Sequence, residues 1–230
     1  REASLPVVAR DVTFNLDRGF WPRVSIVEGD MRDQDAVRET IDGADGVFLL
    51  ASLWLGECVS DPREAWDVNV TGSYNVVAAC ADYKARLVYS SSASVYGDAV
   101  TTPMTEEHQL NNRTTYGATK IACEQMLRAT ASQGLDYLAL RYMNVYGPRM
   151  DRKGEYVSVI MKTIDKILAG ERPVVHGNGN QIYDFVYVED VARANVLAMQ
   201  SEATDRAINI GTGIGTTVKE LVEMILDVTG

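Results

Sequence analysis

Tyr116 and Lys120 form the pair in this sequence best suited to acid–base chemistry. They stand four residues apart at the start of a helix predicted over 116–133, which places both side chains on one helix face. A nearby ammonium group favours a phenolate and lowers the pKa of a tyrosine, so we expect Tyr116 to act as a general base or acid near neutral pH. Taken alone the pair is weak evidence, because this spacing arises by chance and usually marks a solvated helix face.

A run of serines upstream strengthens the case for a site. Ser90, Ser91 and Ser92 end an apolar segment, 87–89, that is typical of a buried strand. In an open parallel sheet, ligands bind beyond the carboxyl ends of the strands. One or two of these serines suit a turn, where they would bond backbone groups. Another can instead hydrogen-bond the hydroxyl group that Tyr116 deprotonates.

The elements that must position these residues alternate between short apolar strands and amphipathic helices. Strands are predicted at 5–9, 24–27, 47–51, 87–91, 137–141, 173–176, 182–188 and 207–210, and helices at 33–41, 62–83, 116–133, 155–169, 189–200 and 216–228. The run 47–50 has no polar alternation and predicts a strand buried on both faces. This alternation predicts a doubly wound α/β fold, with a parallel sheet between two layers of helices.

Composition excludes several classes of protein. Of the 230 residues, 46% are apolar and 23% are charged, which is enough apolar surface for a globular core and excludes a disordered chain. No apolar run approaches the roughly 18 residues of a membrane span. Lys and Arg total 22 against 32 Asp and Glu, for a net charge of −10, which argues against a nucleic-acid-binding surface.

Cysteine and histidine usage predicts neither a disulfide framework nor a metal site. Cys58, Cys80 and Cys123 are widely spaced and odd in number. His108 and His176 have no partners at ligand spacing, and we assign neither a catalytic role. No signal-peptide pattern opens the sequence, so we expect a cytoplasmic protein.

Several segments together resemble one family. They are 28–33, 69–72, 90–97, 116–120, 140–149, 184–188 and 209–213, and they occur in the order and at the spacing typical of that family. The chain resembles the extended short-chain dehydrogenases/reductases, in the NAD-dependent nucleotide-sugar epimerase/dehydratase branch. The resemblance implies a Rossmann-type sheet in a dinucleotide-binding domain over 1–150. It also implies a smaller substrate-binding part over 151–230, from which 182–212 returns to the main sheet.

The resemblance implies a role for each matching position. Ser92, Tyr116 and Lys120 match the catalytic residues. The positions implied in cofactor binding are Asp30, at the adenine amino group, with Met31 beside it; Leu50, Ala51 and Ser52, under the ribose and pyrophosphate; Asn69, Ser90, Tyr116 and Tyr142; and Lys120, at the nicotinamide ribose. Ser92, Asn144, Arg149 and Tyr183 are implied in substrate binding. Three plainer interpretations stay open: Asp30 as the cap of helix 33–41, Asn69 as a structural residue and Tyr142 as a core aromatic.

The sequence departs from the family pattern in two places. The family opens with a strand and a Gly-rich turn that binds pyrophosphate, and no such turn occurs here. We therefore expect the first βαβ crossover and the C-terminal end to be missing, so that the chain is the middle of a longer enzyme. Tyr183 replaces an Arg that clamps the substrate diphosphate in many relatives, so either Arg149 or Arg152 compensates or the substrate differs.

Two small residues narrow the expected activity. Family dehydratases carry an Asp-Glu pair directly after the catalytic residue, and decarboxylases carry a Glu two residues after it. Ala93 and Ser94 occupy these positions and supply no acid or base. The resemblance thus implies an epimerase that oxidises a nucleotide-linked sugar transiently at C4, with the hydride returning to the other face. An oxidoreductase with net redox change and a non-catalytic binding module are the alternatives.

The resemblance also implies a cofactor and an assembly. NAD is favoured, because Asp11 follows the first predicted strand and could meet ribose hydroxyls; Arg10 could instead meet a 2′-phosphate, so NADP stays open. Helices 62–83 and 116–133 match those that pair subunits in the family, so we expect a homodimer. We expect a nucleotide sugar as the substrate, and neither nucleic acid nor a membrane as a partner.

Overall fold

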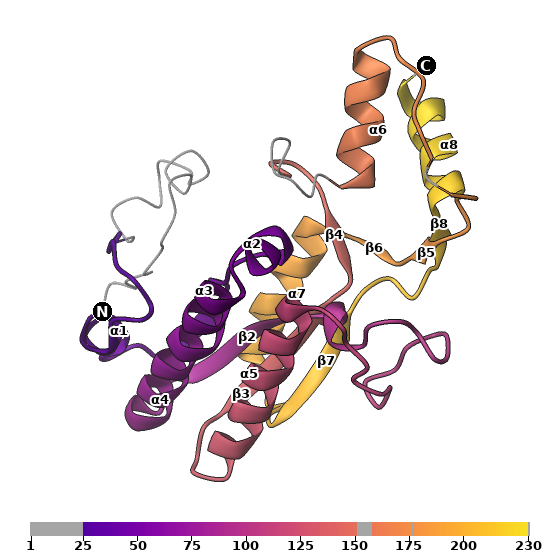
Figure 1. Cartoon of the computed structure of the whole chain (residues 1–230). Helices are drawn as coiled ribbons and strands as arrows, with labels where there is room; N and C mark the ends of the chain where they lie inside the picture. Colours follow the sequence, from indigo (N-terminus) through magenta and orange to yellow (C-terminus); the bar gives the residue numbers. More distant parts are fainter. Residues whose placement is uncertain (1–24, 151–157, 176, 230) are drawn as a thin grey trace.

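A four-stranded parallel sheet forms the centre of the molecule (Figure 1). The computed structural model describes residues 25–150, 158–175 and 177–229. The strands lie in the order β1 (Gly46–Leu49), β2 (Arg86–Ser92), β3 (Tyr137–Tyr142) and β7 (Arg206–Ile210). Leu49 pairs with Tyr89, Ser92 with Tyr142, and Tyr142 with Ile210. Because all four strands are parallel, their carboxyl ends meet at one edge of the sheet, where ligands bind in such folds.

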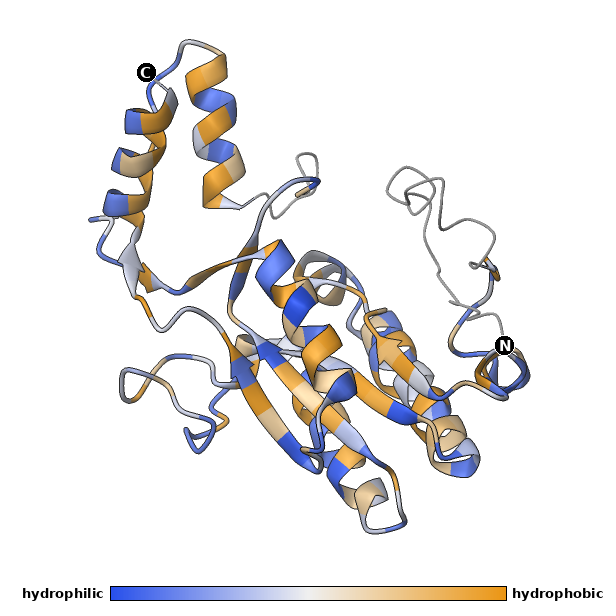
Figure 2. Cartoon of the chain, turned by 180° about the vertical axis from the view of Figure 1, so that it is seen from behind, coloured by the Kyte–Doolittle hydropathy of each residue, from blue (hydrophilic) through white to orange (hydrophobic). Residues whose placement is uncertain are grey.

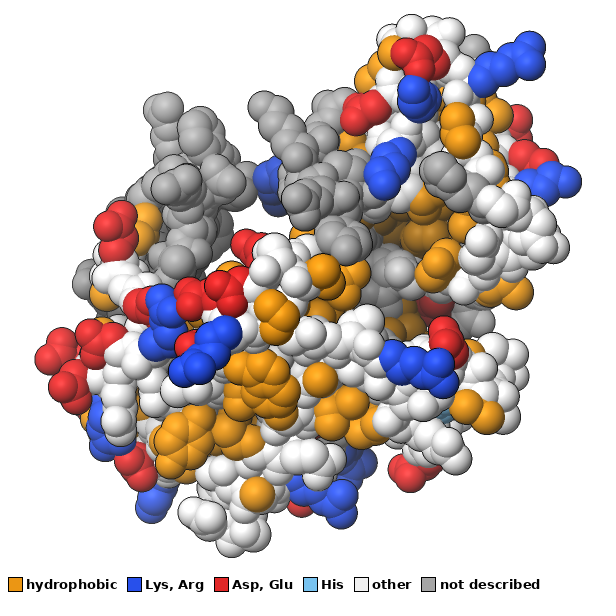
Figure 3. Space-filling view, in the orientation of Figure 1, with side chains coloured by type: hydrophobic (Ala, Val, Ile, Leu, Met, Phe, Trp, Pro, Cys, Tyr) orange, Lys and Arg blue, Asp and Glu red, His pale blue; other side chains and the backbone are white. Residues whose placement is uncertain are grey.

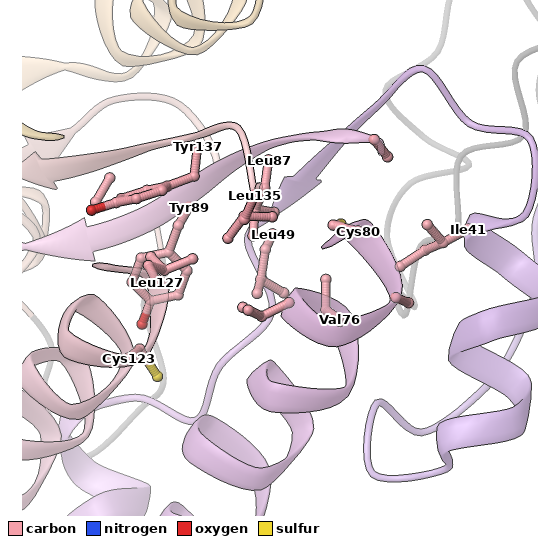
Figure 4. Packing of buried hydrophobic residues seen from close by; sticks show 14 of the residues in the cluster. Ile41, Leu49, Val76, Cys80, Leu87, Tyr89, Cys123, Leu127, Leu135 and Tyr137 are labelled. Atoms are coloured by element: carbon pink, nitrogen blue, oxygen red, sulfur yellow. The ribbon is translucent and has the colours of Figure 1, made fainter. Parts of the chain in front are cut away.

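Helices cover the two faces of this sheet. One face carries α1 (Gln34–Ile41), α4 (Ser73–Tyr83) and α5 (Thr115–Ala131), and the other carries α7 (Val188–Gln200), which Figure 2 shows from behind. The larger core cluster joins strand residues such as Leu87 and Tyr89 to Val76 of α4 and Leu127 of α5 (Figure 4). A second cluster, around Val88, lies under α7. The doubly wound α/β class predicted from the sequence is confirmed.

The helix predicted at 62–83 is divided into three segments. They are α3 (Pro62–Trp66), a π-helical turn, η3 (Asp67–Gly72), and α4. Asp61 caps α3 by accepting from the backbone N–H of Glu64. A short helix that the sequence did not predict, α2 (Leu55–Ser60), precedes them. The π-helical segment directs the side chain of Asn69 inward, and short π-helical segments inside α-helices are frequent at functional sites.

A smaller part stands beyond the carboxyl ends of the strands. There β4 (Asn144–Tyr146) pairs with β6 (Phe185–Tyr187), and β5 (Ile182–Tyr183) pairs with β8 (Thr216–Thr217). Helices α6 (Val159–Leu168) and α8 (Val218–Thr229) pack on each other above the sheet (Figure 1).

Residues 182–212 were expected to return to the main sheet. Of the strands in this segment, only β7 joins that sheet, whereas β5 and β6 pair in the smaller part. The predicted strand 182–188 is broken at Asp184. Its carboxylate turns instead to the loop after β7, where it accepts from the backbone N–H groups of Thr212 and Gly213.

Other predicted strands also need correction. Ser25 is an isolated bridge residue and 26–30 are coil, so no strand forms in the described part of 24–27. Residues 173–175 are coil as well. The strand predicted at 5–9, Arg10, Asp11, Arg152, His176 and the start of helix 155–169 lie outside the described residues.

The strand predicted at 47–51 forms, but it is not buried on both faces. Phe48 is 37% exposed and Leu50 is 62% exposed. Leu49 points into the core under α4, whereas Phe48 points to the opposite side. Within the described residues β1 is an edge strand, which leaves that second side uncovered. None of the described helices is long and apolar enough to cross a membrane.

Candidate active site

The start of α5 carries Tyr116 and Lys120 to the carboxyl end of β2. Thr114 caps this helix, and its hydroxyl accepts from the backbone N–H of Gly117 at 3.1 Å. The Lys120 ammonium donates to the Ser90 carbonyl oxygen at 2.8 Å and to Ser52 Oγ at 3.2 Å. Lys120 therefore joins the ends of β1 and β2 from the α5 side.

Burial controls the charge of Lys120. Its side chain is 2% exposed, and removal from water lowers the pKa of the amine to about 8. The Tyr89 ring offers partial compensation, because Nζ lies 5.1 Å from the ring centroid and the ring face attracts a cation. Lys120 is thus charged at neutral pH but gives up its proton far more readily than a surface lysine.

Tyr116 does not have the lowered pKa expected from the sequence. Burial raises the pKa of its phenol, and hydrogen bonding to Ser92 and Ser52 offsets only part of that effect. Lys120 Nζ lies over the Tyr116 ring, 5.5 Å from its centroid. The expectation is wrong for this structure because desolvation of the phenolate outweighs what its partners supply.

Ser92 ends β2 and faces Tyr116. Its hydroxyl oxygen accepts from the backbone N–H of Ser94 at 3.1 Å and so caps the short 3₁₀ turn η4 (Ala93–Val95). That contact leaves the hydroxyl proton available to a ligand or to the Tyr116 oxygen. The structure therefore brings together the three side chains expected to be catalytic: Ser92, Tyr116 and Lys120.

The loop after β1 lies beside this set. Leu50 and Ala51 are exposed and Ser52 is half-buried. Asn69, 1% exposed, anchors the loop: its Oδ1 accepts from the Leu53 N–H at 2.6 Å, and its Nδ2 donates to the Leu53 carbonyl. Nδ2 also lies 3.2 Å from Thr119 Oγ1 of α5. These contacts agree with the structural interpretation of Asn69.

Asp30 lies in the coil that precedes α1 and is bound by Arg32. The guanidinium and the backbone N–H of Arg32 both donate to its carboxylate, and they lower its pKa. The carboxylate is still 48% exposed and has room to accept another donor. The idea that Asp30 caps α1 is wrong, because Asp33 accepts from the first N–H groups of that helix. Met31 packs against Gly72 so closely that a Cβ added at Gly72 would lie 2.5 Å from Met31 Cγ.

The residues expected to bind substrate lie on separate segments of the smaller part. Asn144 is exposed on β4, and its backbone N–H donates to the Asp184 carbonyl at 2.9 Å. Tyr183, 40% exposed, lies on β5 with its ring 5.9 Å from that of Phe185. Arg149 is exposed and has a left-handed backbone, with φ of +67°.

Sequence reasoning missed two buried networks around the site. In one, Ser91 donates to Glu124, which forms an ion pair with Arg141 at 2.6 Å; both charged side chains are 7% exposed. In the other, Ser90 contacts the Tyr142 hydroxyl, which donates to Asn195 of α7. A polar residue inside an apolar helix face is the signal that marks Glu124 and Asn195 in the sequence.

These residues suit a dinucleotide better than a metal. Lys120 has a third N–H beyond the two it uses, which fits ribose hydroxyls. The exposed Asp30 carboxylate fits an amino group, and the exposed chain at Leu50 and Ala51 fits ribose and pyrophosphate. Among the described residues, no group of three His, Cys, Asp or Glu side chains could hold a metal ion.

The fold and the site together define a nucleotide-binding α/β protein with a Ser–Tyr–Lys set of the dehydrogenase type. The family model for the NAD dependent epimerase/dehydratase family matches residues 4–211, and the chain belongs to that family.

Relatives agree with this assignment. A UDP-N-acetylglucosamine 4-epimerase from Methanobrevibacter ruminantium M1, solved with UDP-N-acetylmuramic acid, is similar at TM-score 0.90 and 35% identity, over 96% of this chain and 72% of its own. A UDP-glucose 4-epimerase from Thermotoga maritima, solved with UDP-glucose, has TM-score 0.87 and 31% identity, over 97% and 72%. A UDP-glucose 4-epimerase from Streptomyces lividans is 31% identical over 95% of this chain and 73% of its own.

Proposed function

We propose that this protein is an NAD-dependent epimerase that inverts C4 of a UDP-linked sugar. The observation that carries the proposal is the meeting of Ser92, Tyr116 and Lys120 at the carboxyl ends of β1 and β2. The similarity to 4-epimerases of UDP-glucose and UDP-N-acetylglucosamine supports both the reaction and the nucleotide.

The side chains divide the chemistry among them. Tyr116, as the phenolate, takes the proton of the sugar hydroxyl and later returns it, and the Ser92 hydroxyl donates a hydrogen bond to the same sugar oxygen. Lys120 holds the ribose hydroxyls and supplies positive charge that favours the Tyr116 phenolate. NAD, when bound, supplies the acceptor for the hydride on that carbon. Lys120 is buried and Tyr116 is half-buried, which limits the access of water to the proton transfer.

The residues after Ser92 favour epimerisation over related reactions. Ala93 and Ser94 form the turn η4 and carry no carboxylic acid. A dehydratase or a decarboxylase of this family would need an acidic or basic side chain at one of these two positions. The Glu106 carboxylate, which follows in the same loop, is instead bonded to the backbone N–H of Asn209.

The test is NMR of the purified protein with a panel of nucleotide sugars, together with an assay for bound dinucleotide. We expect interconversion of a UDP-sugar and its C4 epimer without net absorbance change at 340 nm. A lasting change at 340 nm would favour a net oxidoreductase. Absence of both turnover and dinucleotide binding would favour a non-catalytic module and sink the proposal.

We also propose that two copies associate through α4 and α5. The outward face of α5 carries small residues, Ala118, Ala122 and Ala129, and that of α4 carries Ala78 and the exposed Tyr74. Figure 3 shows hydrophobic side chains gathered over these helices. A surface low in charge and rich in small side chains lets helices of a second copy approach closely.

The three free, buried cysteines support the expectation of a cytoplasmic location.

A further inference from the structure

A chain of hydrogen bonds crosses the sheet at the site, from α5 on one face to α7 on the other. It begins at Lys120, which donates to the Ser90 carbonyl at 2.8 Å. Successive residues of β2 point to opposite faces, so Ser91 turns to Glu124 of α5 while Ser90 turns its hydroxyl to the α7 side. There Ser90 Oγ lies 2.9 Å from the Tyr142 hydroxyl, and that hydroxyl lies 2.9 Å from Asn195 Oδ1.

The directions of the two bonds at the Tyr142 hydroxyl are fixed by Asn195. Its Nδ2 donates to the Val191 carbonyl at 2.8 Å, so its Oδ1 faces Tyr142 and can only accept. The Tyr142 hydroxyl must therefore donate its single proton in the hydrogen bond to Asn195 Oδ1. Ser90 must in turn donate its proton to the Tyr142 oxygen, because Tyr142 has none left to give.

This direction has a consequence for the side chains of the site. The Tyr142 hydroxyl is committed on both sides and is held toward α7, so only its ring is left to face a ligand. Ser90 is held at both its hydroxyl and its carbonyl, and the carbonyl accepts from the Lys120 ammonium, which also donates to Ser52 Oγ. Asn195 is 8% exposed and lies in α7, on the far face of the sheet from Lys120.

From this geometry we propose that Asn195 is a positioning residue of the epimerase site. It holds the Tyr142 ring and, through Ser90, the ammonium of Lys120 in the arrangement that hydride transfer requires. The inference rests on the proposed function for its kinetic part. It extends the site to the α7 layer, which carries none of the residues expected to be catalytic.

The test is a double-mutant cycle between the two ends of the chain. Asn195→Leu and Ser90→Ala should each lower kcat by about tenfold and change the KM of the UDP-sugar by less than about twofold. The double variant should also lose about tenfold, because both changes break one chain of contacts. The NAD dissociation constant should rise in all three variants, and the factor of the rise should be equal in the two single variants and the double variant.

Two matched controls separate positioning from stability. Ser91→Ala removes the neighbouring hydroxyl of β2 on the opposite face, and Val191→Ala shortens a buried side chain of α7 while keeping its carbonyl. Both should lower the midpoint of thermal unfolding and leave kcat within about twofold of wild type. If Asn195→Leu does not fold, Asn195→Ala takes its place in the cycle, since alanine suits a helix interior.

Two results would overturn the proposal. One is an unchanged kcat in a folded Asn195 variant; the other is a loss of about a hundredfold in the double variant, which would mean that the two residues act independently. A wild-type protein that binds NAD but inverts no sugar would defeat the proposed function alone. In that case the cycle measured on the NAD dissociation constant still decides the role of Asn195.

Discussion

Tyr116 is the residue on which the proposed chemistry depends most directly. Tyr116 is half-buried, and loss of solvation raises the pKa of its phenol more than hydrogen bonding by Ser92 and Ser52 lowers it. Tyr116→Phe keeps the ring and removes the group that exchanges the proton. We expect turnover to fall by about 10²–10⁴-fold, the usual size of a general acid–base contribution, with the fold intact. Sugar NMR and circular dichroism measure the two effects.

A matched substitution on the surface controls for the loss of a tyrosine hydroxyl. Tyr83 ends α4 and is 36% exposed, so Tyr83→Phe should leave turnover unchanged. Full activity of Tyr116→Phe would refute the assignment of Tyr116. A collapsed circular dichroism spectrum for Tyr116→Phe would show a structural rather than a chemical role.

Lys120 makes stability depend on pH in a definite direction. Its pKa in the folded chain is about 8, below the ordinary value of 10.5. Below pH 8 the Lys120 amine is protonated in both the folded and the unfolded chain, and the buried charge lowers the free energy of unfolding by its full amount. Between pH 8 and 10.5 the unfolded chain holds the proton more tightly, so the wild type gains stability as pH rises.

A methionine at this position isolates that effect. Relative to Lys120→Met, the wild type should gain about 3 kcal/mol of unfolding free energy between pH 8 and 10.5, since each pKa unit corresponds to about 1.4 kcal/mol. Urea unfolding of both proteins over this range measures the difference. A difference independent of pH would mean that the Lys120 amine keeps its ordinary pKa.

At the scale of elements, the contact between α5 and the turn η4 sets the distance from Tyr116 to Ser92. Gly117 makes that contact possible: a Cβ there would lie 2.1 Å from Asn112 Oδ1 and 2.7 Å from the Ser94 carbonyl oxygen. Asn112 cannot move freely, because its Oδ1 accepts from the N–H and the hydroxyl of Thr114.

Gly117→Ala should therefore push η4 away from α5. We expect a loss of about 1–3 kcal/mol in unfolding free energy, as in other overpacked cores, and a fall in kcat beyond that of a merely destabilised protein. Gly29→Ala is the control, since no atom of the described residues lies within 4 Å of a Cβ at Gly29. Denaturant unfolding and single-turnover kinetics measure both effects, and wild-type values for both would contradict the assigned role of Gly117.

The sequence predicts elements well where local pattern and packing agree. The strands and helices around the site, β2, β3, α5 and α7, fall close to their predicted bounds, because apolar period and capping residues such as Thr114 coincide there. The break at Asp184 and the π-helical turn at Asn69 were not predicted. Both depend on partners distant in sequence, Thr212 and Leu53, which no local pattern reveals. The lowered pKa expected for Tyr116 failed for the same reason, since burial is a property of the whole fold.

At the scale of the whole molecule, the two faces of the sheet differ in their outer surfaces. On the α4 and α5 side, small residues and Tyr74 form the surface proposed to pair two copies (Figure 3). On the other side, α7 exposes the neighbouring residues Val196 and Leu197, and the side of β1 that carries Phe48 is uncovered within the described residues. A continuous surface low in charge is typical of an interface, so the pairing surface is assigned to α4 and α5.

A charge placed on the α4 surface should separate the two copies. Tyr74→Glu buries a carboxylate in the proposed interface, where it has no partner, so we expect a dimer of the wild type and a monomer of the variant. Val196→Glu, at 49% exposure on α7, introduces the same group on the opposite side and should leave the dimer intact. Sedimentation equilibrium at several protein concentrations distinguishes the outcomes. A monomeric wild type, or a Val196→Glu variant that dissociates while Tyr74→Glu does not, would move the interface away from α4 and α5.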